Sequence, residues 1–312
     1  MCSRIINWLF DMSVIAFLYL WTSLTSNKYI IIGKPYGRWG NRLMMFAYAI
    51  AWSKENGCKV INPSFSEYRK HFEYFSDNFL CMIPHSRLLS QGRCFFLESL
   101  FSRSIERIAL RQFPPFFRIS ILDLSVGNIN AKSIDFNELF KSYNTLIING
   151  FVLGERDPEL INNHKNDLTN IFQFTNSVKL RSEKMLGELK SQKLVGICMR
   201  QGDYKSFMDG KFYLSDVDYI DLIKNLKVQF KGKACYFVAS EESKDNFIND
   251  SSIIINCGDP AINMYILSQC DYLIGPPSTF LTWPAWYNDI PTCYVDRFNW
   301  NREHYSFTIP SF

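Results

Sequence analysis

The segment LVGICMRQGDY, residues 194–204, has the pattern of a buried strand that ends in a polar turn. Its apolar run, Leu194–Met199, has the length of a strand that is covered on both faces of a sheet. Four similar runs follow it, at residues 234–239, 253–256, 272–275 and 292–295. Helices are expected between them, at about 215–230, 241–249 and 260–269. Strands that alternate with helices in this way predict a parallel sheet with right-handed crossovers.

The first half of the chain repeats this alternation less regularly. Strands are expected at residues 28–33, 58–62 and 146–151, and helices at 41–56 and 176–190, whereas residues 64–145 show no clear pattern. We therefore predict an α/β protein with two Rossmann-like domains, 27–190 and 191–312, that face each other across a cleft. Ligands of parallel sheets bind beyond the carboxyl ends of the strands, so the cleft is the expected site.

The composition excludes several classes of protein. The 312 residues include 34 Lys and Arg against 30 Asp and Glu, 47% are hydrophobic, and no basic block is present. These values exclude a disordered, fibrous or polytopic membrane protein, and they argue against a nucleic-acid partner. The nine cysteines have no C-x-x-C spacing and several of them, such as Cys198, Cys235, Cys257 and Cys293, fall in or beside apolar runs. That usage favours a reducing compartment, and the four scattered histidines give no support for a zinc or iron site.

The first 26 residues are predicted to form an apolar helix. Residues 5–24 have the length of a membrane span, but Asp11 interrupts them and the uninterrupted apolar part is only Val14–Trp21. No small-residue cleavage signal follows, which argues against a removed signal peptide. Two interpretations stay open: a membrane anchor or interfacial helix, and an amphipathic helix that packs on the body of the protein.

Two polar segments follow predicted strands and are candidates for ligand binding. In the first, GRWGNR at residues 37–42, glycines allow a tight turn and a helix begins near Asn41, so that backbone N–H groups point into the crevice. In the second, Arg200 stands at the end of its strand with Asp203 beside it. A guanidinium there suits a diphosphate, which it can grip with two parallel hydrogen bonds. The alternatives are an ordinary strand-to-helix turn and an Arg–Asp ion pair that closes a strand.

A third candidate segment is GPPSTFLTW, residues 275–283. Its strand ends at Gly275, and Ser278 and Thr279 then begin a short helix that Pro284 should limit or kink. Hydroxyl and backbone N–H groups at such a helix terminus suit phosphate oxygens. The alternative is that Ser278 simply caps the helix.

Together the three segments resemble glycosyltransferase family 11, the α-1,2-fucosyltransferases. That family has a G-x-x-G-N-Q-L-F-Q-Y-A opening, an H-x-R-R-G-D-Y strand end and a late S-S-F-S-W-W-A-A-W stretch. The counterparts here, in the same order, are GRWGNRLMMFAYA, CMRQGDY and PSTFLTWPAWY, and YFVASEES at 236–243 is similar to the family's F-S-D-D segment. In the opening, Arg42 stands where the family has glutamine. Two departures lie in the strand-end motif: Cys198 replaces the histidine and Gln201 replaces the second arginine.

The resemblance implies a GT-B-type fold, with the acceptor on the side of domain 27–190 and the nucleotide sugar bound by domain 191–312. It also implies an inverting, metal-independent transfer of L-fucose from GDP-fucose to the 2-hydroxyl of a galactoside in a surface glycan. It implies Arg200 and Asp203 as catalytic residues. Arg200 would stabilise the departing diphosphate, and Asp203 would orient Arg200 or deprotonate the acceptor. The implied donor-binding residues are Gly40, Asn41, Arg200, Ser240, Ser278 and Thr279. The implied partners are a nucleotide-sugar donor and an oligosaccharide or lipid-linked glycan acceptor, with no other cofactor.

The two departures motivate a second hypothesis, a catalytically degenerate member that binds a nucleotide sugar or a glycan without turnover. A dehydrogenase is disfavoured because the G-x-G-x-x-G fingerprint is missing. Cysteine usage and the apolar N-terminus favour a bacterial enzyme that associates with the cytoplasmic face of the inner membrane. The alternative is a Golgi type II membrane protein.

Overall fold

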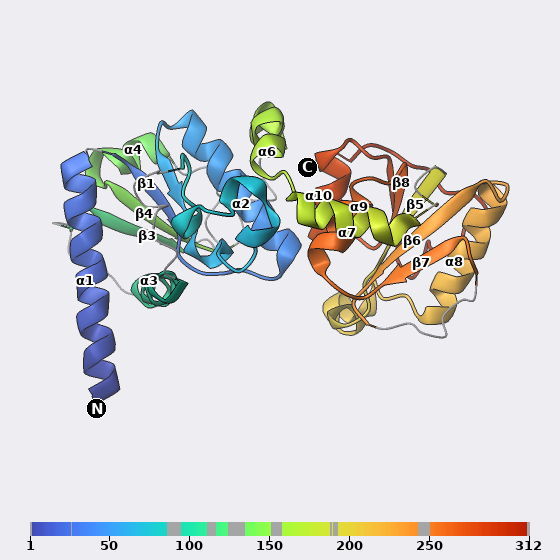
Figure 1. Cartoon of the computed structure of the whole chain (residues 1–312), viewed down its shortest axis with the longest axis horizontal. Helices are drawn as coiled ribbons and strands as arrows, with labels where there is room; N and C mark the ends of the chain where they lie inside the picture. The colour runs from blue at the N-terminus through green and yellow to red at the C-terminus, as the bar shows by residue number, and fades with distance from the viewer. Residues whose placement is uncertain are drawn as a thin grey trace. The chain divides into compact units, whose positions relative to one another are not determined.

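The computed structural model describes residues 2–25, 27–85, 95–110, 117–123, 135–150, 158–187, 189, 193–242 and 250–310. The chain divides into two compact units, Met1–Gln173 and Phe174–Phe312 (Figure 1). The predicted boundary at residues 190–192 lies outside the described residues. The division comes earlier, because helix α7 (Asn176–Leu186) packs against α9 (Pro260–Leu267) of the C-terminal unit.

The N-terminal unit is built on a four-stranded parallel sheet with strand order β2-β1-β4-β3. Its strands are β1 (Tyr29–Ile32), β2 (Lys59–Ile61), β3 (Ile119–Asp123) and β4 (Thr145–Asn149). Its helices are α1 (Cys2–Thr25), α2 (Trp39–Glu55), α3 (Phe95–Ile108), α4 (Phe136–Ser142), α5 (Pro158–Asn163) and α6 (Lys165–Ile171). Every residue of β1 and β4 is buried, as expected for parallel strands covered on both faces. The strands predicted at 28–33, 58–62 and 146–151 are confirmed, and β3 and α3 lie in the region where no pattern was visible.

Helix α1 packs one of its faces against α3 and the sheet. Val14, Ile15 and Leu18 belong to the core of the unit. The Asp11 carboxylate is fully buried, where it accepts hydrogen bonds from Arg107 Nη2 at 2.5 Å and from Ser104 Oγ at 2.8 Å. The charge of Asp11, which argues against a membrane span, is therefore compensated by Arg107 and Ser104 of α3. Among the described residues, no helix has the length and apolar character that a transmembrane segment requires.

The C-terminal unit contains a five-stranded parallel sheet with strand order β7-β6-β5-β8-β9. Its strands are β5 (Lys193–Met199), β6 (Ala234–Ser240), β7 (Ile253–Asn256), β8 (Tyr272–Gly275) and β9 (Thr292–Tyr294), and α8 (Asp216–Gln229), α9 and α10 (Thr279–Tyr287) complete it. All five predicted strands are confirmed to within one residue at each end. Ser215 caps α8 in a capping box with Asp218, which explains why this helix begins where the sequence predicts. The helix expected at 241–249 lies mostly outside the described residues.

The strand order of this sheet reverses between β5 and β8. The chain proceeds from β5 to β6 and β7 on one side and then returns to place β8 and β9 on the other. In a sheet of this kind the crevice beyond the carboxyl ends of the two strands at the reversal is the usual ligand site. The predicted α/β fold with two parallel sheets is therefore confirmed, and the reversal identifies the edge at which a ligand is expected.

Candidate donor site

Three of the predicted segments lie at the carboxyl ends of three adjacent strands. Arg200 follows β5, Ser240 ends β6, and Ser278 follows β8. Met199 pairs in register with Ser240, and Ile197 pairs with Ile274, so the strand ends are level with one another. The sequence separates these residues widely, but the sheet brings them to one edge, on both sides of the strand reversal.

The Arg200 guanidinium lies between two carboxylates of its own unit. Nη1 donates to Glu241 Oε1 at 2.7 Å, and Nη2 donates to both oxygens of Asp203, at 2.9 Å and 3.3 Å. The other Glu241 oxygen accepts from the backbone N–H of Gly202 at 3.3 Å. A Cβ atom on Gly202 would lie 3.1 Å from that oxygen, so glycine permits this approach. The ion pair that closes a strand is thus present, and Glu241 makes it a three-residue cluster.

The cluster stays charged although it is mostly buried. The side chain of Arg200 is 14% exposed and that of Glu241 is 23% exposed. Burial lowers the pKa of Arg200, whereas the negative charges of Cys198 in its thiolate form, which exists only at high pH, and of the Glu241 carboxylate raise it above its ordinary value. One cation with two carboxylates gives the cluster a formal charge of −1 before any ligand arrives. A diphosphate would therefore compete with Glu241 and Asp203 for the guanidinium, of which Nε has no hydrogen-bond partner among the described residues.

Tyr204 connects the end of β5 with the end of β8. Its ring lies under the Arg200 guanidinium, with 5.0 Å between Cζ and the ring centroid, and its hydroxyl donates to the carbonyl of Pro277 at 2.7 Å. Burial raises the pKa of Tyr204 to about 12, so the hydroxyl remains a donor at neutral pH. Tyr219 of α8 holds the end of β5 itself, because its hydroxyl accepts from the Arg200 backbone N–H at 3.2 Å and donates to the Cys198 carbonyl at 3.3 Å. These contacts hold the backbone at the strand end rigidly.

The two residues that depart from the family pattern are turned away from solvent. Gln201 is buried, and its amide donates to the Leu214 carbonyl at 2.9 Å and to Asp216 Oδ1 at 2.8 Å. Its side chain thus holds the chain that leads into α8 and supplies no charge for a ligand. Cys198 is fully buried, and burial raises its thiol pKa to about 11. Cys198 therefore stays a neutral thiol, with Ser278 as its hydrogen-bonding neighbour.

Ser278 is the N-cap of α10. Its side chain accepts from the Leu281 N–H at 3.2 Å, and Thr279 is the first residue of the helix. The capping alternative is therefore confirmed for Ser278. A capped helix terminus still directs the positive end of its dipole towards the strand ends, where an anion is stabilised. Helix α10 continues past Pro284 to Tyr287, so the proline lies inside the helix and does not end it.

The remaining predicted donor-binding residues have different surroundings. The Ser240 hydroxyl donates to the Glu242 carbonyl at 2.8 Å and accepts from the Glu242 N–H at 3.2 Å, so it closes the turn after β6. Gly40 and Asn41 belong to the N-terminal unit, in the first turn of α2. There Gly37 has φ +62°, and a Cβ atom on it would lie 2.2 Å from Asn41 Nδ2, so the glycine makes room for the asparagine. A role of Gly40 and Asn41 in donor binding stays a prediction.

Glu241 is the site residue that the sequence analysis did not select. It lies in the quoted YFVASEES segment, one residue after β6, which is the neighbour of β5 in the sheet. A polar residue directly after the strand next to β5 is a usable signal for such a position. Within the described ranges, no group of three or more His, Cys, Asp and Glu side chains is arranged to hold a metal ion. Cysteines in or beside apolar runs are expected to be buried; this is confirmed for Cys198, Cys235 and Cys293, and is wrong for Cys257, which is exposed.

Solved structures that resemble this chain are fucosyltransferases. A mutant of Arabidopsis thaliana FUT1 in complex with GDP matches with a TM-score of 0.59 at 14% identity, over 90% of this chain and 74% of that one. Bradyrhizobium NodZ, an α-1,6-fucosyltransferase soaked with GDP-fucose, matches with a TM-score of 0.53 at 14% identity, over 91% and 99% of the two chains. POFUT1 in complex with GDP matches with a TM-score of 0.50 at 12% identity, over 85% and 95%. At these identities the similarity identifies the fold, which is that of GT-B-type fucosyltransferases.

Two sequence comparisons gave different results. A search of curated protein sequences gave no match. The family model described as glycosyl transferase family 11 matches residues 161–308, which include β5, the Arg200 cluster and α10. The predicted resemblance to glycosyl transferase family 11 is therefore confirmed over residues 161–308.

Proposed function

We propose that this protein transfers L-fucose from GDP-fucose to the 2-hydroxyl of a galactoside, with inversion at the sugar carbon. The observation that carries the proposal is the meeting of Arg200, Ser240 and Ser278 at the strand reversal, inside the region that matches a glycosyltransferase family. The diphosphate of the donor would bind at this edge, between Arg200 and the N-terminus of α10.

In the proposed reaction the acceptor oxygen attacks the fucose carbon as the bond from that carbon to the diphosphate oxygen breaks. GDP leaves with the bonding electron pair, and the proton of the acceptor hydroxyl passes to water. Negative charge grows on the leaving oxygen, and a guanidinium already in place stabilises it, by about 3–4 kcal/mol in comparable preorganised sites. Arg200 is the residue to which we assign this role.

Asp203 is assigned to positioning. Both of its carboxylate oxygens accept from the same nitrogen of Arg200, which fixes the guanidinium plane. Its side chain is 53% exposed. Because both oxygens are paired with Arg200, a general-base role would require the carboxylate to leave this pair. The first role uses contacts that already exist, and we therefore favour it.

A second function, nucleotide-sugar or glycan binding without turnover, is favoured by one observation. The Arg200 cluster has a formal charge of −1, and neither Cys198 nor Gln201 brings a further cation to it. A transferase and a binding protein differ in their products. Incubation with GDP-fucose and a panel of galactosides, followed by mass spectrometry, should give a product heavier by one fucose residue. Free fucose without this product would show donor hydrolysis, and GDP binding without either product would support the second function.

Membrane association is also part of the proposal. The face of α1 opposite the core exposes Ile6, Leu9, Phe17, Leu20 and Leu24, and Leu24 is 83% exposed. The N-terminal end of α1 extends beyond the rest of its unit (Figure 1). An apolar helix face of this kind is suited to lie in the interface of a bilayer.

A further inference from the structure

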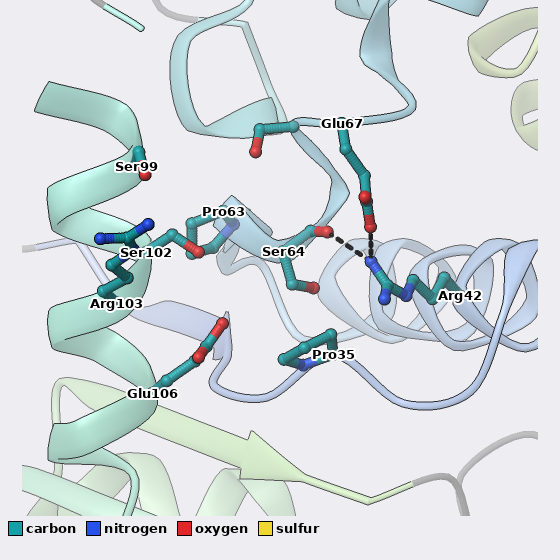
Figure 2. Close-up of a pocket in the computed structure, with 10 residues that line it drawn as sticks. Pro35, Arg42, Pro63, Ser64, Glu67, Ser99, Ser102, Arg103 and Glu106 are labelled. Atoms are coloured by element: carbon teal, nitrogen blue, oxygen red, sulfur yellow. Dashed lines mark hydrogen bonds and ion pairs between the residues drawn. The ribbon is translucent and has the colours of Figure 1, made fainter. Parts of the chain in front are cut away.

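The N-terminal unit has a cavity of about 380 Å³ beyond the carboxyl ends of β1 and β2. Figure 2 shows its two walls: α3 on one side, and the segments that follow β1 and β2 on the other. The volume lies within the range of about 300–1,000 Å³ that is typical of small-molecule sites. The edge is also the one at which parallel sheets bind ligands.

The α3 wall is polar because this helix is amphipathic. Phe101, Ser104, Ile105 and Ile108 lie on its buried side. Ser99, Ser102, Arg103 and Glu106 line the cavity, at the spacing of one helix face. Within the described part of the chain, the two serine hydroxyls and the Arg103 guanidinium make no hydrogen bond or ion pair. Their donors and acceptors are therefore available to a ligand.

The opposite wall is rigid. Arg42 donates to the Gly37 carbonyl at 3.1 Å and to the Ser64 carbonyl at 3.2 Å, and it forms an ion pair with Glu67. Phe65, which lies between Ser64 and Ser66 in the sequence, is fully buried, and its ring centroid is 5.1 Å from that of Phe46. The buried phenylalanine fixes the positions of Ser64 and Ser66, so the wall is preorganised.

The lining identifies the chemistry of the ligand. Two arginines and two glutamates give a formal charge of zero, so a phosphate or nucleotide would gain little attraction here. Four serines line the cavity, and the apolar side chains among the described lining residues are two prolines. The cavity is therefore unsuited to an apolar ligand. Hydroxyl groups of a sugar donate and accept hydrogen bonds at once, and the lining offers both kinds of partner.

We infer that this cavity binds a neutral saccharide, which on the proposed function is the acceptor. Arg103 donates to the sugar and Glu106 accepts from it, while the Arg42–Glu67 pair forms the fixed back wall. The assignment of this saccharide as the acceptor substrate rests on the proposed function. Binding of the saccharide itself is independent of the donor.

The test is binding of the full-length protein to an array of neutral and acidic glycans, followed by titration of the best neutral ligand. Arg103→Ala and Glu106→Gln should each weaken the affinity for that ligand by about tenfold or more, because hydrogen bonds to charged groups are lost. Ser102→Trp should abolish binding by filling the cavity. Lys141→Ala is the control, because Lys141 is 71% exposed and forms an ion pair with Glu138 on the surface of the same unit. Thermal unfolding of each variant should match wild type.

Two results would overturn the inference: no neutral glycan is bound by the wild-type protein, or the three cavity variants bind as tightly as wild type. A preference for acidic glycans that Arg103→Ala removes would also contradict it, since the site would then recognise charge. Titration with GDP is run in parallel. The cavity variants should bind GDP as wild type does, so loss of glycan binding with intact GDP binding tests the cavity alone. Absence of GDP binding in every protein would count against the proposed function and leave the cavity result unaffected.

Discussion

Replacement of Glu241 by glutamine should strengthen GDP binding. The Glu241 carboxylate accepts from Arg200 Nη1 at 2.7 Å and from the Gly202 N–H at 3.3 Å. It therefore holds the two donors that a phosphate oxygen would use, and acts as an internal competitor. Glutamine keeps the shape of the side chain and removes its negative charge, so the cluster of one cation and two carboxylates becomes neutral.

The size of the effect follows from the geometry. A unit charge about 5 Å from a phosphate at an effective dielectric constant of about 20 contributes about 3 kcal/mol. Glu241 is 23% exposed, so solvent and salt reduce this to about 1–2 kcal/mol, equivalent to about 5–30-fold in affinity. Isothermal titration of GDP into wild type and Glu241→Gln, at the same moderate salt concentration, measures the difference. Higher salt should make the two affinities more similar.

The matched control is Asp203→Asn, which removes the other carboxylate of the cluster. Asp203 is 53% exposed and accepts from a single nitrogen of Arg200, so the gain in GDP affinity should be smaller. Unchanged or weaker GDP binding by Glu241→Gln would refute the competition argument. Glu241 would then serve to hold the guanidinium in its binding position.

Three further predictions concern stability and membrane binding. Gln201→Ala should lower the free energy of unfolding by about 1–3 kcal/mol in chemical denaturation, because the Leu214 carbonyl loses its buried donor; wild-type stability would contradict this. Burial raises the pKa of Cys198 to about 11, from about 9 in the unfolded chain. Between these pH values the unfolded chain loses the thiol proton while the folded protein keeps it, so the free energy of unfolding falls as the pH rises from about 9 to about 11. Chemical denaturation at about pH 8 and about pH 10 should show that the free energy of unfolding falls less for Cys198→Ala than for wild type. An equal fall in the two proteins would argue against a raised pKa of Cys198. Phe17→Glu with Leu20→Glu should abolish flotation of the protein with phospholipid vesicles without lowering its melting temperature, and flotation equal to wild type would exclude α1 as the membrane contact.

The C-terminal sheet was predictable because each of its strands is an apolar run bounded by turn residues. Leu194–Met199 and Tyr272–Gly275 are examples, and both are buried on two faces, so the run itself marks the strand. Strand β3 was not predictable, because four of its five residues are only partly buried and its sequence, ISILD, includes polar residues. Its position is set by pairing with β4, in which each partner lies 26 positions later in the chain, as Asn149 does for Asp123.

The candidate site was predictable in part. Strand ends identified Arg200 and Ser278, because a residue directly after a buried parallel strand must lie at the ligand edge. The role of Gln201 was not visible, since its partners are Leu214, in the segment before α8, and Asp216, the first residue of α8. The position of Glu241 directly after β6 was a usable signal, but its contact with Arg200 depends on the pairing of β5 with β6. The cavity beside α3 could not be predicted, since it is formed by three segments that lie far apart in the sequence.

The central claim is that Arg200 binds the diphosphate of the donor, and the affinity of the full-length protein for GDP tests it most directly. Calorimetric titration of wild type and Arg200→Ala should show GDP binding weakened by at least about tenfold in the variant, because a charge-assisted pair is lost. Binding of guanosine, which has no phosphate, should be equal in the two proteins. Equal affinity of wild type and Arg200→Ala for GDP would contradict the claim.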